Sequence, residues 1–200
     1  MSISTLVVLI SGSGTNLQAI IDATENNSLN AKIELVVSNR KAAYGLVRAE
    51  QHGIPIKYFP LKPYTDVGKT REDYDLDLSV LVAECQPTLV VLAGWMQVFT
   101  PVFLNHFPNK VINLHPALPG AFAGTHAIER AFEAYQRGKI SESGCMIHYV
   151  IPEVDAGEVI TTATVPFQEG DTLEMYEARM HEAEHELIVK GIRLALEGLA

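Results

Sequence analysis

Short strand-like runs alternate with stretches of helical spacing along most of the chain. Each run is four to seven residues long, which is the usual length of a strand. The predicted strands are Leu6–Ile10, Ile33–Val37, Ile54–Phe59, Leu89–Leu92, Val111–Leu114, Met146–Ile151 and Val159–Val165. The predicted helices follow Gly14 or cover Leu46–Gln51, Tyr74–Cys85, Ile128–Tyr135 and the segment from Asp171 onward. This alternation predicts an α/β fold, with a mostly parallel, doubly wound sheet and helices on both faces.

Three segments refine this pattern. The run Val159–Val165 alternates between apolar and polar residues, which indicates an antiparallel or edge strand. Residues 60–70 contain two prolines and a glycine and are predicted to form a loop. Asp171 and Glu174 have the spacing of a capping box and are predicted to open the last helix. Because ligands of such folds bind at the carboxyl ends of the strands, a functional site is expected in the loops that follow the strands.

Composition and charge narrow the class of protein. The chain has 200 residues, of which 48% are apolar and 20% charged, and this predicts one globular domain. Its net charge is 15 − 24 = −9, which argues against binding a nucleic-acid backbone. No apolar run approaches the length of a membrane span. The two cysteines, Cys85 and Cys145, are expected to be reduced thiols, which predicts a cytoplasmic protein. From the net charge and the short apolar runs we expect neither a nucleic-acid nor a membrane partner.

A glycine-rich segment, Ser11–Asn16, connects the first predicted strand to the first predicted helix. Glycines allow a ligand to approach the backbone, and a helix N-terminus offers free N–H groups to an anion. No lysine follows as in a Walker A loop, and Leu17 occupies the third glycine position of the dinucleotide fingerprint. Thr15 and Gln18 have capping-box spacing. The segment is therefore either a cradle for one phosphomonoester or a structural turn.

Two polar residues stand near the end of a predicted interior strand, where apolar residues are usual. Asn113 and His115 are two residues apart, so their side chains share a face of the sheet. An amide N–H beside an imidazolium is suited to stabilising an acyl oxyanion. Asp155, just before Gly157, is a candidate carboxylate that would raise the pKa of His115 and orient its ring. The alternative is a histidine that is hydrogen-bonded for structure alone.

Other polar residues have simpler interpretations. His148 lies on the predicted strand Met146–Ile151 and either faces the same cleft or is a satisfied buried histidine. His181, Glu184 and His185 are three and four residues apart on the last helix. A solvated helix face is favoured there over a metal site, so no metal is expected.

Six segments resemble the phosphoribosylglycinamide (GAR) formyltransferase family, in wording closest to the fungal monofunctional enzymes. These are Val8–Ala19, Val91–Met96, Asn113–Gly120, Thr125–Glu129, Gly144–Val150 and Val154–Gly157. The similarity runs from about Leu6 to Ile192. It implies a single formyltransferase domain over residues 1–200 with a Rossmann-type fold. It also implies an enzyme of purine biosynthesis and one-carbon metabolism, which transfers the formyl group of the co-substrate 10-formyltetrahydrofolate to the amine of GAR.

The resemblance implies three groups of site residues. The catalytic positions are Asn113, His115 and Asp155. The GAR-binding positions are Gly14, Thr15, Asn16 and Glu184. The folate-binding positions are Arg71, Met96, Gln97, Val98, Phe99, Asn113, Ile151, Pro152, Glu153 and Val154. Gln97 stands where the family often has arginine. Asn113 and a protonated His115 are expected to stabilise the oxyanion while Asp155 sustains the imidazolium, without a metal. The oligomeric state is left open.

Three rival functions follow from the same residues. A formyl-folate hydrolase shares the catalytic signature but would carry an extra N-terminal domain. A methionyl-tRNA formyltransferase would need a further C-terminal domain and a basic surface, whereas residues 169–200 have a local charge of 3 − 8 = −5. A phosphosugar-binding module would need the glycine-rich cradle but not Asn113, His115 and Asp155 together.

Overall fold

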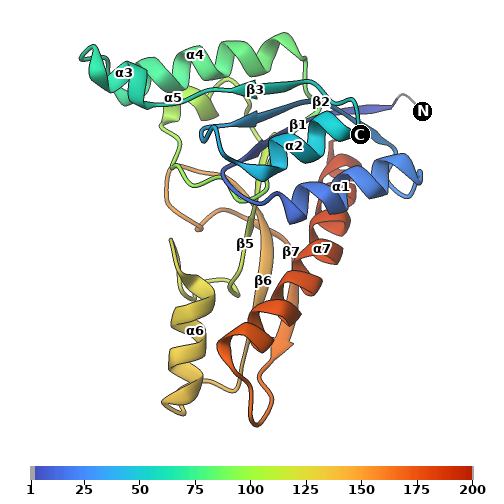
Figure 1. The fold of residues 1–200 in the computed structure, drawn as a ribbon, viewed down its shortest axis with the longest axis vertical. Helices are drawn as coiled ribbons and strands as arrows, with labels where there is room; N and C mark the ends of the chain where they lie inside the picture. The colour runs from blue at the N-terminus through green and yellow to red at the C-terminus, as the bar shows by residue number, and fades with distance from the viewer. Residues whose placement is uncertain (1–2, 200) are drawn as a thin grey trace.

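Seven strands form one twisted sheet in the computed structural model, which describes residues 3–199 (Figure 1). The strands are β1 (Ser4–Ile10), β2 (Ala31–Ser38), β3 (Ile56–Tyr58), β4 (Leu89–Leu92), β5 (Val111–His115), β6 (Glu142–Tyr149) and β7 (Val159–Pro166). Their order is β3-β2-β1-β4-β5-β6-β7. Strands β1 to β5 pair in parallel, and β6 pairs antiparallel with both of its neighbours, β5 and β7. The α/β prediction and the antiparallel edge strand are confirmed.

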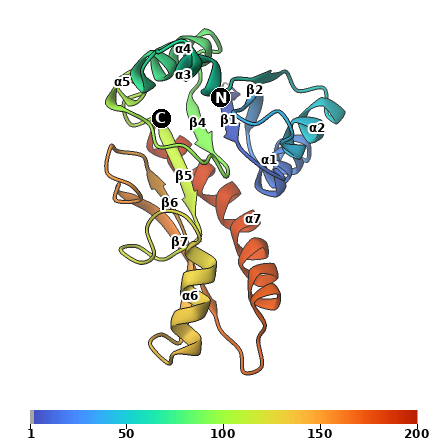
Figure 2. The ribbon, with the colours of Figure 1, turned by 60° about the vertical axis from the view of Figure 1, so that its left-hand side comes forward.

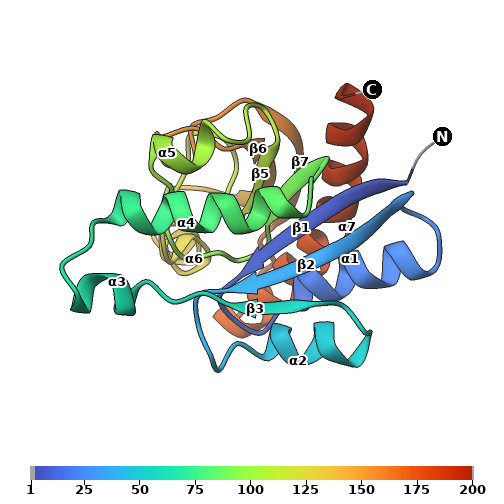
Figure 3. The same ribbon diagram turned by 90° about the horizontal axis from the view of Figure 1, so that it is seen from above.

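Helices cover both faces of the sheet (Figure 3). They are α1 (Thr15–Glu25), α2 (Tyr44–Gln51), α3 (Lys62–Asp66), α4 (Arg71–Glu84), α5 (Pro101–Leu104), α6 (Ala127–Gln136) and α7 (Leu173–Gly198). One core contains residues of α1, α2, α6 and α7, and the other contains residues of α4 and α5. Strand β1 supplies both cores alternately, Leu6, Val8 and Ile10 to the first and Val7 and Leu9 to the second.

Two short helices were not expected from the sequence. Helix α3 lies inside the predicted loop 60–70, where Pro63 stands in the first turn and Lys62 pairs with Asp66 at 2.7 Å. Helix α5 also begins with a proline, and its Phe103 is fully buried in the second core. Tertiary burial stabilises this single turn, which is too short to give a periodic pattern.

The predicted capping residues of two helices were wrong. Helix α1 begins after Gly14, in the left-handed conformation at φ +72°, without a side-chain cap from Thr15. Thr172, not Asp171, caps α7 by accepting a hydrogen bond from the Met175 amide. Asp171 instead accepts from the Gln168 amide and pairs with Arg179.

The order of the strands places a crevice at the carboxyl ends of β1 and β4. The chain leaves β1 toward β2 and β3 and then returns to the other side of β1 as β4. Loops that follow neighbouring strands therefore diverge at this point, where such folds bind ligands. Strands β5, β6 and β7 extend beyond β1 and β4 and are flanked by α6 and α7 (Figure 2). None of the helices between residues 3 and 199 has the length and apolar character that a membrane crossing requires.

Candidate active site

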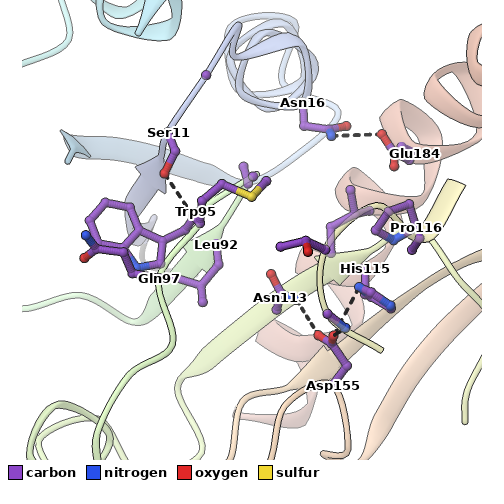
Figure 4. A pocket seen from close by; sticks show the side chains of 18 of the residues that line it. Ser11, Asn16, Leu92, Trp95, Gln97, Asn113, His115, Pro116, Asp155 and Glu184 are labelled. Atoms are coloured by element: carbon purple, nitrogen blue, oxygen red, sulfur yellow. Dashed lines mark hydrogen bonds and ion pairs between the residues drawn. The ribbon is translucent and has the colours of Figure 1, made fainter. Parts of the chain in front are cut away.

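A cleft of about 770 Å³ lies at the carboxyl edge of the parallel strands (Figure 4). Its walls come from the glycine-rich loop after β1, the loop after β4, the end of β5, the loop after β6 and one face of α7. Thirteen of the expected site residues line it: Gly14, Thr15, Asn16, Met96, Gln97, Val98, Phe99, Asn113, His115, Ile151, Val154, Asp155 and Glu184. Arg71, Pro152 and Glu153 are not among the described lining residues.

The glycine-rich loop is fixed by close packing against α2. A Cβ on Gly14 would lie 2.5 Å from the Gly45 Cα, so the loop and the helix touch through two glycines. The Gly45 amide donates to the Gly12 carbonyl at 3.1 Å, and Arg48 Nε donates to the Ser13 carbonyl at 2.9 Å. These contacts hold the N-terminus of α1, with its free N–H groups, at the cleft.

Ser11 connects this loop to the opposite wall of the cleft. Its side chain is buried, and its Oγ accepts a hydrogen bond from the Met96 amide at 2.9 Å (Figure 4). The same hydroxyl donates to Asn39 Oδ1 at 2.7 Å, and the Ser11 amide donates to the Gly94 carbonyl at 2.9 Å. The segment 94–96 is therefore positioned directly by the residue that begins the glycine-rich loop.

Asp155 lies at the centre of a polar cluster on β5 and β6. Its Oδ2 is 3.3 Å from His115 Nδ1, and its Oδ1 is 3.4 Å from His148 Nε2 and from Asn113 Nδ2. Asn113 and His148 are direct cross-strand partners, and Asn113 Nδ2 lies 3.2 Å from His148 Nε2. The structure thus joins the three expected catalytic residues and adds His148, which is 2% exposed and whose Nδ1 donates to the Tyr149 carbonyl.

The backbone around Asp155 is strained and tightly packed. Asp155 has φ +53°, and a Cβ on Gly157 would lie 1.7 Å from the Tyr149 carbonyl oxygen. Burial by itself raises the pKa of the Asp155 carboxyl, but the contact with His148 and the hydrogen bond from the Gly124 amide outweigh it. The pKa therefore lies below its ordinary value of 3.8, and Asp155 is a carboxylate at neutral pH.

Asp155 raises the pKa of His115 as expected, but the pKa is lowered overall. Burial lowers this pKa, and Asp155 and the Phe122 carbonyl, which accepts from His115 Nε2 at 3.2 Å, only partly oppose the effect. The pKa lies below the ordinary 6.5 because desolvation of a ring that is 4% exposed outweighs one facing carboxylate. At neutral pH the neutral imidazole is therefore the dominant form.

The solvated face expected for α7 was also wrong at Glu184, which is only 4% exposed. Its Oε2 accepts from Asn16 Nδ2 at 3.2 Å and lies 3.0 Å from His181 Nδ1 (Figure 4). The hydrogen bond to Glu184 raises the pKa of His181 above 6.5. Among residues 3–199, no group of three or more histidine, cysteine or acidic side chains has the arrangement of a metal site.

The wall beyond β4 is apolar and open to ligand. Met96, Val98 and Val154 are about half exposed although they line the cleft. Behind them Trp95 stacks on Phe99 with ring centroids 5.8 Å apart. A flat aromatic ligand fits such a wall, because binding would remove these side chains from water.

Arg71 stands outside the described cleft lining. Its Nε donates to Asp75 Oδ1 at 2.8 Å, and Asp75 is fully buried. The other oxygen of Asp75 accepts from the Thr100 amide at 2.7 Å, just beyond the apolar wall. In this structure Arg71 is thus connected to the wall through Asp75.

The chain matches known proteins along nearly its whole length. Residues 4–192 match the family model described as "Formyl transferase". A phosphoribosylglycinamide formyltransferase of Schizosaccharomyces pombe is 50% identical over 95% of this chain and 96% of its own length. One of Dictyostelium discoideum is 48% identical, over 94% of this chain and 96% of its length.

A solved structure agrees with this assignment. Glycinamide ribonucleotide transformylase 1 of Symbiobacterium toebii has a TM-score of 0.91 at 36% identity, covering 98% of this chain and 89% of that protein. A fungal protein is among the relatives, as the amino-acid sequences of the motifs predicted. The chain belongs to the formyl transferase family, and within it to the phosphoribosylglycinamide formyltransferases.

Proposed function

We propose that the protein transfers the formyl group of 10-formyltetrahydrofolate to the glycinamide amine of GAR, a step of purine biosynthesis. One observation carries the proposal: the Asn113, His115 and Asp155 cluster shares a cleft with a helix N-terminus and an apolar wall. This arrangement supports binding of a phosphate, binding of an aromatic group and proton transfer within one cleft. The names of the relatives point to the same reaction.

The glycine-rich loop and α7 form the proposed GAR site. The backbone amides of Gly14, Thr15 and Asn16 would bind the phosphate, since they stand at the start of α1. Glu184, which already accepts a hydrogen bond from Asn16, would accept from sugar hydroxyls. A buried carboxylate facing the cleft favours a polyol there, because hydroxyl groups can donate to it.

The apolar wall forms the proposed folate site. The lining residues that would contact the aromatic part of the co-substrate are Met96, Gln97, Val98, Phe99, Asn113, Ile151 and Val154. Pro152 and Glu153 belong to the same loop as Val154 and are proposed to flank the co-substrate. Arg71 keeps its proposed role only if its guanidinium turns from Asp75 toward the co-substrate, which carries carboxylates.

The neutral His115 ring is the proposed proton carrier. The GAR amine attacks the formyl carbon, and the electron pair of the carbonyl moves to its oxygen. An N–H of Asn113 would donate to this oxygen, because its contact with Asp155 at 3.4 Å is at the long limit for a hydrogen bond. His115 would accept a proton from the nitrogen that has attacked and become cationic. The accepting atom is Nδ1, which faces Asp155, because Nε2 already donates to the Phe122 carbonyl.

The proton then leaves with the folate nitrogen. The electron pair on the oxyanion re-forms the carbonyl while the bond between the formyl carbon and N10 breaks, and N10 keeps the electron pair of that bond and takes the proton that His115 accepted. Asp155 stays ionised and stabilises the transient imidazolium, since the pKa of Asp155 is lowered. The products are formylated GAR and tetrahydrofolate. The lowered pKa of His115 favours this route over the standing imidazolium expected from the sequence.

The setting of the reaction is also inferred. Cys85 and Cys145 are free thiols, which suits the reducing cytoplasm that we propose as the location. We further propose that residues 1–200 form one formyltransferase domain with small-molecule substrates and no nucleic-acid partner, in line with the net charge of −9.

Incubation with 10-formyltetrahydrofolate, with and without GAR, tests the proposed function. We expect loss of the formyl group only when GAR is present, with formylated GAR identified by mass spectrometry. Loss without GAR would instead indicate a hydrolase. Binding of either compound without turnover would indicate a binding module.

Replacing Ser11 by alanine is expected to weaken folate binding. The Met96 amide would lose its acceptor, which costs about 1–3 kcal/mol and loosens the apolar wall. We expect KM for 10-formyltetrahydrofolate to rise about tenfold with a much smaller change in kcat, measured in steady state. The matched control is Ser79→Ala, another fully buried serine, whose hydroxyl only donates to the Leu76 carbonyl of its own helix. An equal rise of KM in the control would contradict the role of Ser11.

A further inference from the structure

Arg130 on α6 donates hydrogen bonds to the loop that contains Phe122 and Ala123, beside the catalytic cluster. Its Nη2 donates to the carbonyl of Phe122 at 2.6 Å and to that of Ala123 at 2.7 Å, and its Nε donates to the His126 carbonyl at 3.3 Å. Its guanidinium also lies 5.9 Å from the centre of the Phe122 ring. Within residues 3–199 no carboxylate oxygen lies within 4.0 Å of it, so these carbonyls are its partners.

The same loop contacts both His115 and Asp155. The Phe122 carbonyl accepts from His115 Nε2 at 3.2 Å, so it is shared between Arg130 and His115. Two residues later, the Gly124 amide donates to Asp155 Oδ2 at 2.8 Å. Phe122 has φ +47°, a conformation that a bulky residue adopts only when its surroundings impose it.

We propose that Arg130 is a positioning residue of the catalytic centre, which fixes the segment Phe122–Gly124 and through it the orientation of His115 and Asp155. The inference rests on the proposed function. Arg130 is not among the described residues that line the cleft, so it acts through the loop and not by touching substrate. A planar fork that binds two neighbouring carbonyls restrains a loop more firmly than a single ammonium group does.

Arg130 also influences when His115 carries a proton. The charged and polar groups that face His115 are Asp155 and the Phe122 carbonyl, which raise its pKa, and His148 and Arg130, which lower it. Removing the Arg130 charge therefore raises the pKa of His115. If the neutral ring is the proton acceptor, the acid limb of kcat then moves to higher pH.

The experiment measures kcat, both KM values and the pH profile of GAR-dependent transfer in Arg130→Met, Arg130→Lys and Arg137→Met. Arg137 ends the same helix and pairs with Glu133 at 3.4 Å, so it is the matched control. In Arg130→Met we expect kcat to fall roughly 10- to 100-fold, the effect of a misplacement of about 1 Å. Both KM values should change less than about twofold, because no substrate contact is lost.

The variants separate positioning from general destabilisation. Arg130→Lys keeps the charge but not the fork, so we expect an intermediate kcat with the acid limb where the unaltered protein has it. Arg130→Met should show a limb at higher pH, and Arg137→Met should match the unaltered protein. Wild-type kcat in Arg130→Met, or an equal loss in Arg137→Met, overturns the proposal. If Arg130→Met does not fold, Arg130→Lys decides, and a wild-type kcat in that variant overturns it. Absence of GAR-dependent transfer in the unaltered protein overturns the proposed function instead.

Discussion

Replacing His115 by alanine is expected to lower kcat about 10²–10⁴-fold, the range typical of a lost general acid–base group. His115 is the ring that faces the ionised Asp155 at 3.3 Å with a lowered pKa, so it is suited to take a proton near neutral pH and return it. Its loss leaves the glycine-rich loop and the apolar wall in place. Steady-state kinetics should therefore show nearly unchanged KM values for both substrates.

The pH profile adds a second measurement. Because the pKa of His115 is lowered, the neutral ring predominates above that pKa, which lies below 6.5. We expect kcat of the unaltered protein to be constant on the alkaline side of this pKa and to fall as the pH drops through it. The limb should disappear in His115→Ala. His106→Ala, at an exposed ring that bonds to the Val102 carbonyl, is the control and should keep both rate and limb. An unchanged limb in His115→Ala would assign it to another group.

The sheet could be predicted because its strands are buried as continuous apolar runs. All four residues of Leu89–Leu92 are buried, and the predicted bounds are those of β4. Strand β6 was predicted four residues late, since Glu142 and Ser143 look polar although Ser143 is buried. Elements such as α5 are stabilised by contacts distant in sequence and have too few residues to show a period.

The sequence could predict only those parts of the site that depend on side chains unusual for their position. Asn113 and His115 stand out on an interior strand, but His148 enters the cluster through the register in which it pairs with Asn113. The sequence did not predict that β5 pairs antiparallel with β6. A prediction of that pairing would have placed His148 beside Asn113. The contacts of Phe122 and Gly124 come from the backbone, which any residue supplies, so no sequence pattern marks them.

The net charge of −9 places a demand on the cleft, because both proposed substrates are anions. Arg48 is engaged with the Ser13 carbonyl, and Arg71 with Asp75. Arg40 lines the cleft, and so does His181, whose pKa is raised by the hydrogen bond to Glu184. The start of α1 adds a partial positive charge. Local groups therefore oppose the overall charge where the phosphate is proposed to bind.

Replacing Asp155 by asparagine is expected to lower kcat by up to about 10⁴-fold, as when an orienting carboxylate beside a catalytic histidine is lost. The change preserves the shape, and asparagine tolerates the positive φ of this position. It removes the charge that stabilises the imidazolium formed during proton transfer. It also presents an amide N–H group to His115, His148 or the Gly124 amide, all of which lie near the carboxylate.

Stability should change with pH in the same variant. The pKa of Asp155 is lower in the folded protein than the ordinary 3.8, so the folded state is stabilised above that value and loses this stabilisation as the pH falls through the folded pKa. Urea unfolding should therefore show the largest difference between the two proteins near neutral pH and a shrinking one below about pH 4. Asp66→Asn, at an exposed carboxylate on α3, is the control and should retain full activity. Full activity in Asp155→Asn would remove Asp155 from the mechanism, and a stability difference independent of pH would mean that its charge does not stabilise the fold.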